Sequence, residues 1–409
     1  MTEASQQPRG RHVFAELRGI SPAVLDDAPK LSEALRSALV TAGAQVRQVV
    51  SEAFTPHGVT VVAVLAESHA SVHTWPEHGQ AFADVFTCGD SADPVAAVRL
   101  LGDALGAADT TLRVVDRGAG SPDSSPTLSE PLSAGLRRLW ELGEVRWQGD
   151  TGFQRVLIAD TSHGVTLFCD DERQSAESSQ LVYHEALFVP AALLAERLDS
   201  VLVIGSSEGV VSQLAVSAGA AVVDHVDIDA ECVRACARHL PYGYRVEELA
   251  AAERGDGPVR MHYADCAAFV EHADRRRDVI VVDLPDERPD DAGAQHNRLY
   301  GTEFLRRCAE LLTPGGVLVS QAGCPTLWRN ETLRTAWRRF GAVFDTVAYH
   351  GSDEHEWAFL LGGREPVADP TALMVDRLRS LPYRPVSIDA ARLQAGSMPP
   401  RSVRESSIR

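Results

Sequence analysis

The strongest constraint on the fold is a change of composition between Gly118 and Ser129. This segment is built from Gly, Pro, Ser and Asp with small residues, and no large apolar residue appears before Leu128. Such a composition is typical of a flexible connector. The chain has 409 residues, enough for two or three domains that each bury a core. We therefore expect separate domains before and after this segment.

The residues before the connector predict a compact α/β domain over residues 12–117. Apolar residues at helical spacing predict helices near residues 31–42, ended by Gly43, and near residues 92–107. Apolar and alternating runs predict five strands, at Val13–Leu17, Val46–Phe54, Val59–Leu65, Ala81–Thr87 and Leu112–Val115. The polar residues that follow Leu65 are interpreted as a loop.

Beyond the connector, the pattern predicts a linker over 118–150 and a β-hairpin subdomain over 151–182. Residues 183–365 then alternate a helix at 185–197 with strands at Val201–Ile204, Ala221–Ile228 and Val279–Val282, with further helices between them. Strands that alternate with helices favour a parallel, doubly wound, Rossmann-like sheet. Residues 366–409 are left as a C-terminal extension.

Charge and cysteine content exclude several classes of partner. With 39 Lys and Arg against 57 Asp and Glu, the net charge is −18, so the overall field repels nucleic acid and anionic lipid and favours cationic small molecules. No apolar run approaches the length that spans a membrane, and residues 1–14 have no apolar core of a signal peptide. The seven cysteines form no C-x-x-C pair. We expect a cytoplasmic protein with reduced thiols and no metal.

Chemically active residues are dense just after the strand Val59–Leu65. The segment Glu67-Ser68-His69 is followed by His73-Thr74-Trp75-Pro76-Glu77, and a later strand ends Phe86-Thr87-Cys88-Gly89. A polar turn is the plain interpretation. A metal site from the two histidines four residues apart is weaker, because no glutamate follows the first one.

Together these motifs resemble the prokaryotic S-adenosylmethionine decarboxylase family over about residues 12–116. The resemblance implies an α/β sandwich that cuts its own chain between Glu67 and Ser68. It also implies a pyruvoyl group made from Ser68, which forms a Schiff base with the substrate and serves as the electron sink that no ordinary side chain offers. His73 would assist the cut, Thr60 stands at a position where relatives carry a small hydroxyl residue, and Cys88 would protonate the product. Active sites in the family form between two protomers, so a homo-oligomer is expected.

The substrate of this first domain is left open by the same residues. Relatives of the family are thought to include enzymes that act on ornithine or arginine, and Glu16 replaces the aspartate of the usual opening motif. The processing residues build the cofactor but do not choose the amino acid.

The larger domain carries a glycine turn, Gly205–Gly209, between a strand and a helix, and Asp227 closes the next strand. Glycines allow a ligand to approach the backbone, and a carboxylate at the second strand can hold ribose hydroxyls. By itself this signal fits many nucleotide-binding folds.

Further motifs in the same order resemble the spermidine synthases over about residues 154–363. They are Tyr183-His184-Glu185, Asp265, Asp283-Leu284-Pro285-Asp286, the segment 299–304 around Tyr300, and Val319–Gln321. The resemblance implies a substrate site that contains His184, Gly205 and two glutamines, Gln154 and Gln174. Asp227 would bind ribose, Asp265 adenine and Glu208 the aminopropyl amine. Asp283 and Asp286 would bind and deprotonate the acceptor, oriented by Tyr183 and Tyr300.

Two departures concern this second site. The family's G-G-G-D-G becomes Gly205-Ser206-Ser207-Glu208-Gly209, which adds side chains at the donor turn, and Pro285 replaces a small hydroxyl residue between the two acids. The leading hypothesis is a bifunctional enzyme of polyamine biosynthesis that makes decarboxylated S-adenosylmethionine and transfers its aminopropyl group to a diamine. The alternatives are an ornithine or arginine decarboxylase in the first domain, and a second domain that only binds.

Overall fold

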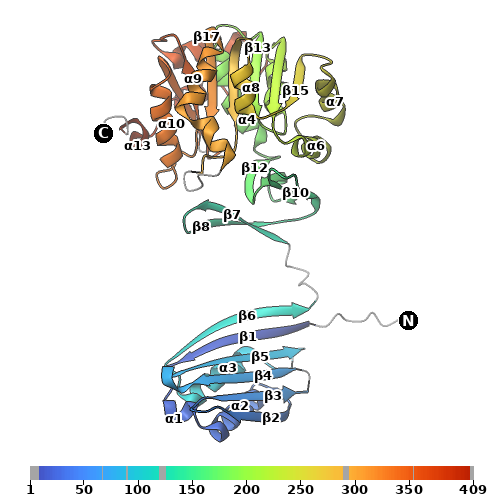
Figure 1. Ribbon diagram of the computed structural model, residues 1–409, viewed down its shortest axis with the longest axis vertical. Coiled ribbons are helices and arrows are strands. Elements are labelled where there is room, and N and C mark those ends of the chain that lie inside the picture. Colours follow the sequence, from blue (N-terminus) through green and yellow to red (C-terminus); the bar gives the residue numbers. More distant parts are fainter. Residues whose placement is uncertain are drawn as a thin grey trace, which may run out of the picture. The chain divides into compact units, whose positions relative to one another are not determined.

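The chain divides into two units, Met1–Ser124 and Ser125–Arg409, within the segment that the composition marks as a connector. The computed structural model describes residues 9–66, 68–88, 91–118, 126–288, 294–352 and 354–405. Each unit contains its own sheets and helices (Figure 1). No helix among the described residues is both long enough and apolar enough to cross a membrane.

The first unit is one antiparallel sheet with helices on one face. Its strands run in the order β2-β3-β4-β5-β1-β6. The elements are β1 (Arg9–Arg18), α1 (Pro22–Leu25), α2 (Ala28–Thr41), β2 (Val46–Ala53), β3 (Val59–Leu65), β4 (His69–Trp75), η1 (Pro76–His78), β5 (Gln80–Cys88), α3 (Pro94–Leu105) and β6 (Asp109–Gly118).

The two faces of this sheet differ sharply. Alternate residues of β3, β4 and β5 are buried in a core shared with α2 and α3, as expected for a sheet covered on one side. The other face, which we call the open face, carries exposed apolar side chains: Phe14, Val50, Phe54, Val62, Val64 and Phe82. Apolar patches of this kind mark interaction surfaces.

The expectation of a loop after Leu65 is wrong, because most of the segment is the strand β4. It pairs with β3 on one side and β5 on the other. Ala70, Val72 and Thr74 enter the core while His69 and His73 lie on the open face. The polar residues on the open face concealed the alternation that identifies a strand.

The second unit begins with two small sheets where a linker and a simple hairpin were expected. Strands β7 (Thr127–Ser133) and β8 (Leu136–Glu141) pair with each other, and β9 (Val145–Asp150), β10 (Arg155–Thr161), β11 (Gly164–Cys169) and β12 (Glu172–Ala176) form a four-stranded sheet. Trp140 and Leu128 are buried against Phe168, and the Trp140 indole donates a hydrogen bond of 2.7 Å to Glu130. Residues 127–150 therefore belong to the folded second unit, although a linker was expected there.

The main sheet of the second unit has the order β15-β14-β13-β16-β17-β19-β18. The first five of these strands are parallel, whereas β19 is antiparallel to both neighbours. Its elements are α4 (Gln180–Leu194), β13 (Ser200–Gly205), α5 (Val210–Ser217), β14 (Val222–Asp227), α6 (Ala230–His239), α7 (Val246–Arg254), β15 (Val259–Tyr263), α8 (Cys266–His272), β16 (Arg277–Asp283), η2 (Gln295–Tyr300), α9 (Thr302–Glu310), β17 (Leu312–Gln321), α10 (Glu331–Gly341), β18 (Thr346–Gly351) and β19 (Ala358–Gly363).

Both faces of this sheet are covered, as the doubly wound prediction requires (Figure 1). Val201 and Val203 of β13 pack into one core with α4 and α5, whereas Leu202 and Ile204 pack into a second core with α8 and α9. Burial on both faces explains why the strand is a continuous apolar run. The order reverses between β13 and β16, where ligands bind in open α/β sheets.

The C-terminal residues complete the fold and are more than an extension. They form α11 (Pro370–Arg377), η3 (Leu378–Ser380), α12 (Ala390–Gly396) and α13 (Arg401–Arg404), and Met374 and Leu393 enter the core beside α4. The buried Glu185 of α4 accepts hydrogen bonds from Tyr383 and from the backbone of residues 386 and 387. A buried carboxylate without these donors would be costly, so the segment is part of the domain.

Two candidate active sites

Ser68 lies in the tight turn between β3 and β4. The Leu65 amide donates to the Ser68 carbonyl at 2.9 Å, which closes the turn. The Ser68 hydroxyl is buried and has no hydrogen-bond partner among the described residues. Buried polar atoms are nearly always satisfied, so the Ser68 hydroxyl is an exception that needs an explanation. Glu67, the predicted residue before the cut, lies outside the described residues.

Cys88 lies at the same end of the sheet as Ser68. The β4–β5 register pairs His69 with Phe86, and Cys88 follows two positions later on the same open face. Its thiol is free and half-buried. The first unit therefore places two of the residues predicted for its site at the same end of the sheet.

His73 lies at the other end of β4. Its Nδ1 is hydrogen-bonded to the Thr60 hydroxyl across the β3–β4 pair. Five residues of extended chain separate it from Ser68, which corresponds to about 16 Å. A single copy of the chain therefore does not bring His73 to the Ser68 hydroxyl.

A cluster that the sequence interpretation missed lies beside Ser68 on the open face. One ligating atom each of His12, His69 and Asp84 lies within 4.8 Å of the others. His12 Nε2 is 3.3 Å from Asp84 Oδ2, and the Ser71 hydroxyl donates to the same carboxylate. Recognising β4 as a strand would have placed His69 and Ser71 on one face and revealed the cluster.

The second unit contains a cavity of about 430 Å³ at the carboxyl ends of β13, β14 and β16. Of the eleven side chains and glycines predicted for this site, ten line the cavity: Gln154, Gln174, Tyr183, His184, Gly205, Glu208, Asp227, Asp265, Asp283 and Asp286. Tyr300, the eleventh, does not line the cavity. Its hydroxyl donates to the carbonyls of Leu284 and Pro285 at 2.9 and 2.8 Å.

The turn after β13 needs its two glycines. Gly205 and Gly209 have φ of +80° and +78°, where side chains are unfavourable. A Cβ on Gly205 would lie 2.3 Å from the Asp283 carbonyl, and one on Gly209 would lie 2.2 Å from the Tyr244 ring. Ser206 has φ of +69° without being glycine, so the altered turn keeps the left-handed geometry at some cost.

Carboxylates surround the donor side of the cavity. The Ser207 hydroxyl donates to Asp227 Oδ2 at 3.0 Å, and burial raises the pKa of Asp227 to about 7. Gln154 Nε2 donates to Asp229 at 3.0 Å, whereas Gln174 Nε2 donates to a backbone carbonyl in β12 at 3.2 Å. Glu208 is buried and lines the cavity. The added serine thus holds an acid of the site.

Asp265 caps α8, and its carboxylate accepts from the Ala268 amide at 3.0 Å. That backbone hydrogen bond is the main reason why the pKa of Asp265 is lowered, with a further contribution from Arg298. Arg298 forms an ion pair with Asp265. The sequence motif predicted the acid but not its arginine partner.

Asp283 has the environment of a base. The Tyr183 hydroxyl donates to Oδ1 at 2.7 Å, and His184 Nε2 is 3.9 Å from Oδ2. Burial raises the pKa of Asp283, and the nearby His184 and Tyr183 partly oppose this rise. A buried carboxylate with a raised pKa holds a proton more readily than an exposed one.

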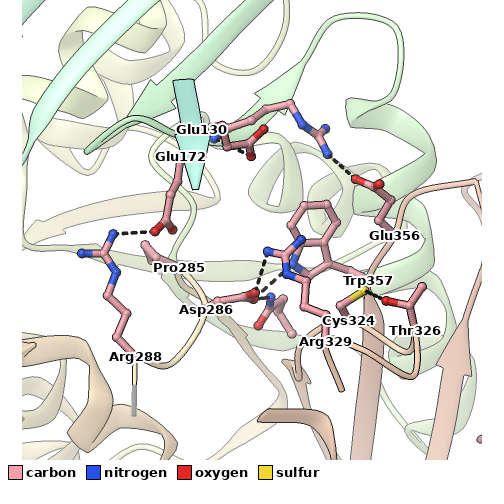
Figure 2. Close-up of polar contacts among 12 residues, drawn as sticks. Glu130, Glu172, Pro285, Asp286, Arg288, Cys324, Thr326, Arg329, Glu356 and Trp357 are labelled. Atoms are coloured by element: carbon pink, nitrogen blue, oxygen red, sulfur yellow. Dashed lines mark hydrogen bonds and ion pairs between the residues drawn. The ribbon is translucent and has the colours of Figure 1, made fainter. Parts of the chain in front are cut away.

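The Asp286 carboxylate accepts hydrogen bonds from three side chains, of which Arg329 and Trp357 are labelled in Figure 2. Gln321 Nε2 and the Trp357 indole, the latter at 3.2 Å, donate to Oδ1. Arg329 donates to Oδ2 at 3.3 Å. Neither Arg329 nor Trp357 was predicted, because both follow the last motif that the sequence comparison used.

The comparisons with known proteins find a match to a family model in each of the two units. Residues 11–118 match the family model of S-adenosylmethionine decarboxylase. The S-adenosylmethionine decarboxylase proenzyme of Moorella thermoacetica is 42% identical over 120 residues, which is 29% of this chain and 96% of that protein. The proenzyme of Carboxydothermus hydrogenoformans is 45% identical over 109 residues, 27% of this chain and 86% of that protein.

Residues 180–350 match the spermine/spermidine synthase domain. A spermidine synthase solved with the transition-state analogue AdoDATO superposes with a TM-score of 0.60 at 18% identity, over 70% of this chain and 96% of that one. The spermidine synthase of Thermotoga maritima gives 0.58 at 17%, over 70% and 95%. The chain therefore belongs to the S-adenosylmethionine decarboxylase family through residues 11–118 and is fused to a second part whose residues 180–350 match the model of the spermine/spermidine synthase domain.

Proposed function

We propose that the chain carries out two consecutive steps of polyamine biosynthesis. The first unit decarboxylates S-adenosylmethionine, and the second transfers the aminopropyl group of the product to an amine. One observation carries the first half: the motif Glu67-Ser68-His69 contains a serine whose buried hydroxyl has no partner among the described residues. The order of the two domains on one chain supports the second half, since the product of one is the donor for the other.

The free Ser68 hydroxyl fits the role of the nucleophile that makes the cofactor. It attacks the carbonyl carbon of Glu67, and the peptide bond is exchanged for an ester. Elimination then releases the carboxylate of residue 67 and leaves dehydroalanine at position 68, which reacts with water to give a pyruvoyl group and ammonia. Such a group supplies an electron sink when carbon dioxide leaves.

The other residues of the first unit would hold and move protons. Cys88, at the same sheet end as Ser68, would return a proton to the carbon that loses carbon dioxide. His73, held by Thr60, would take the proton from the Ser68 hydroxyl. Since about 16 Å of strand separates them in one copy, the His73 that assists a given Ser68 would come from a second copy.

The open face supports such a pairing. Its exposed apolar side chains gain burial if two sheets pack face to face, and a two-fold axis brings the Ser68 end of one sheet over the His73 end of the other. The active unit would then be a dimer with two shared sites.

In the second unit, charge would select the reactants. The sulfonium donor and the amine acceptor are both cations, and the cavity is lined with carboxylates. Asp227 would hold the ribose, Asp265 the adenine and Glu208 the aminopropyl amine. Asp283, with a raised pKa and with Tyr183 donating to it, would accept the proton that makes the acceptor amine nucleophilic.

Intact mass of the purified chain tests the first step. Cleavage gives fragments of residues 1–67 and 68–409, the second blocked at its amino end. Carbon dioxide release from carboxyl-labelled S-adenosylmethionine, ornithine and arginine then identifies the substrate. An uncut chain overturns the pyruvoyl assignment, and release from ornithine or arginine alone moves the chemistry to that amino acid.

Formation of methylthioadenosine from decarboxylated S-adenosylmethionine and an amine tests the second step. Binding of methylthioadenosine without any turnover would mean that the second unit is a binding module.

A further inference from the structure

Several arginine side chains lie at one end of the cavity in the second unit, where they pair with carboxylates. We call this region the acceptor end; it consists of Glu172, Asp283, Asp286, Arg288, Arg329 and Trp357, with Arg173 alongside. Figure 2 labels Glu172, Asp286, Arg288, Arg329 and Trp357. Arg288 pairs with Glu172 at 2.8 Å, and Arg329 pairs with Asp286 at 3.3 Å. The guanidinium of Arg173 lies 5.2 Å from the Trp357 ring centre and pairs with Glu356 at 3.2 Å.

These pairs leave little negative charge for a second cation. A diamine that carries a charge at each end needs two available carboxylates. Among the described acids of the acceptor end, Glu172 and Asp286 are each neutralised by an arginine, whereas Asp283 pairs with no arginine. A diamine ammonium at Asp286 would have to compete with Arg329, and two cations would then share one partly buried region. Like charges close together in such a region repel strongly.

Most N–H groups of the Arg329 guanidinium have no hydrogen-bond partner among the described residues. Its side chain is 18% exposed, and its position is fixed by a turn in which its amide donates to the Thr326 carbonyl at 2.9 Å. Its guanidinium stands 5.7 Å from the Trp357 ring centre. One of its five N–H groups reaches Asp286, so the others can receive a carboxylate in the two-pronged geometry that arginine favours.

We propose that the acceptor is an amine that also bears a carboxylate, an amino-acid-type molecule, and that Arg329 binds that carboxylate. The proposal rests on the proposed transferase function and names its substrate class. The acceptor ammonium lies at Asp283 and the carboxylate at Arg329, so that the charges of the acceptor match those of the acceptor end.

The transfer step balances with the residues present. Asp283 accepts one proton from the acceptor ammonium. The freed nitrogen lone pair attacks the aminopropyl carbon next to sulfur, a C–N bond forms, and the C–S bond breaks with its electron pair left on sulfur. The products are neutral methylthioadenosine and a secondary ammonium, with the proton on Asp283 returned to solvent.

The experiment compares acceptors that differ by one carboxylate. Ornithine is putrescine with a carboxylate, and lysine stands in the same relation to cadaverine. The full chain carrying Ser68→Ala is used, so that the first unit cannot decarboxylate an acceptor, and methylthioadenosine release from decarboxylated S-adenosylmethionine is measured. We expect kcat/KM for the amino acid to exceed that for its diamine by about tenfold or more, as for the loss of a charged hydrogen-bond partner.

Arg329→Gln should remove this preference by raising KM for the amino acid, with little change in KM for the diamine. The matched control is Arg234→Gln, which breaks an exposed ion pair between Arg234 of α6 and Glu253 of α7 and should leave the preference unchanged. Titration of ornithine and putrescine into the methylthioadenosine complex gives the same comparison as binding constants, whether or not turnover is seen.

The outcomes separate the two proposals. Turnover that favours the diamine, or a preference that survives Arg329→Gln, overturns the carboxylate assignment and leaves the transferase intact. No methylthioadenosine with any acceptor overturns the transferase, and the titration then decides the assignment. If intact S-adenosylmethionine serves as donor and Arg329→Gln abolishes that activity, the carboxylate is the donor's, and the acceptor assignment is wrong.

Discussion

The two sites of this chain are built in different ways. In the first unit, the predicted residues are spread along one antiparallel sheet, with Ser68 and Cys88 at one end and His73 further along β4. In the second unit, residues from β13, β14, β16 and the small sheets surround a single cavity. Carboxyl ends of parallel strands bring distant segments of one chain together, whereas an antiparallel sheet spreads its residues along the strands.

This difference determines what each site needs. The cavity of the second unit is enclosed by one copy of the chain, so its chemistry should not depend on association. The open face of the first unit leaves its residues apart and its apolar side chains exposed, so its chemistry should depend on a partner. The two activities of one polypeptide should therefore respond differently to the same changes.

The largest effect is expected from Ser68→Ala. Without the hydroxyl the chain cannot form the ester, so cleavage and decarboxylation should fall below detection. The hydroxyl has no partner among the described residues, so its removal breaks no hydrogen bond there and the fold should persist. Intact mass and carbon dioxide release measure the loss, and methylthioadenosine formation should be unchanged. Ser51→Ala on the exposed part of β2 is the matched control, and loss of both activities in Ser68→Ala would argue against independent sites.

Asp283→Asn should have the opposite effect to Ser68→Ala: transfer should be lost and decarboxylation kept. The amide keeps an oxygen for the Tyr183 hydroxyl but cannot take up a proton, so the transfer rate should fall about 10³-fold, as for removal of a general base. Decarboxylation and chain cleavage should remain normal. Asp256→Asn, in an exposed ion pair with Arg254, controls for a change of charge. A drop of less than tenfold would remove Asp283 from the role of base.

Donor binding to the second unit should depend on pH. Burial raises the pKa of Asp227 from 3.8 to about 7, and the ionised carboxylate is the form that accepts the ribose hydroxyls and attracts the sulfonium. Affinity for decarboxylated S-adenosylmethionine should therefore rise about tenfold between pH 6 and pH 8. Calorimetric titration at both pH values measures it, and Asp227→Asn should bind weakly with little pH dependence.

The stability of the unliganded chain should change with pH in the opposite direction to donor affinity. Because the pKa of Asp227 is raised on folding, its contribution to the free energy of unfolding is present at low pH and is lost as pH rises from about 4 through about 7. A wild-type affinity that is equal at pH 6 and pH 8 would show that Asp227 is not the group that controls donor binding.

The sequence predicted those parts of the fold in which periodicity and burial agree. The run Val201–Ile204 is apolar because both faces of β13 are buried, and it was identified as a buried strand. β4 was missed because His69 and His73 lie on a face with no core beneath it. Strands β7 and β8 were missed because their burial depends on Phe168, forty residues from Leu128, and composition alone cannot reveal such a contact.

The candidate sites divide in the same way. Residues inside short motifs, such as Asp283 and Asp286, were found because their spacing is local. Two of the partners of Asp286 were not, because Arg329 lies beyond β17 and Trp357 lies just before β19. Charge balance at a site is a property of these long-range contacts. The sequence therefore suggested an acidic site, and the fold adds the arginines that pair with two of its acids.

The smallest effect, but the most direct test of the comparison, is complementation between two inactive chains. Chains with Ser68→Ala and with His73→Ala are co-expressed under two different tags. If the site is shared, half of the dimers are mixed and each holds one complete site, so decarboxylation should return to about a quarter of the wild-type level.

A second mixture, made in the same way from Asp283→Asn and Tyr183→Phe chains, should give no more transfer than the sum of the two chains measured separately, because each cavity lies within one chain. Two results would contradict this comparison: recovery of transfer activity in the second mixture, or no recovery of decarboxylation in the first. Either would mean that the two sites do not differ in their need for a second copy of the chain. Cleavage of the His73→Ala chain only in the mixed dimer would show that the partner's histidine assists the cut.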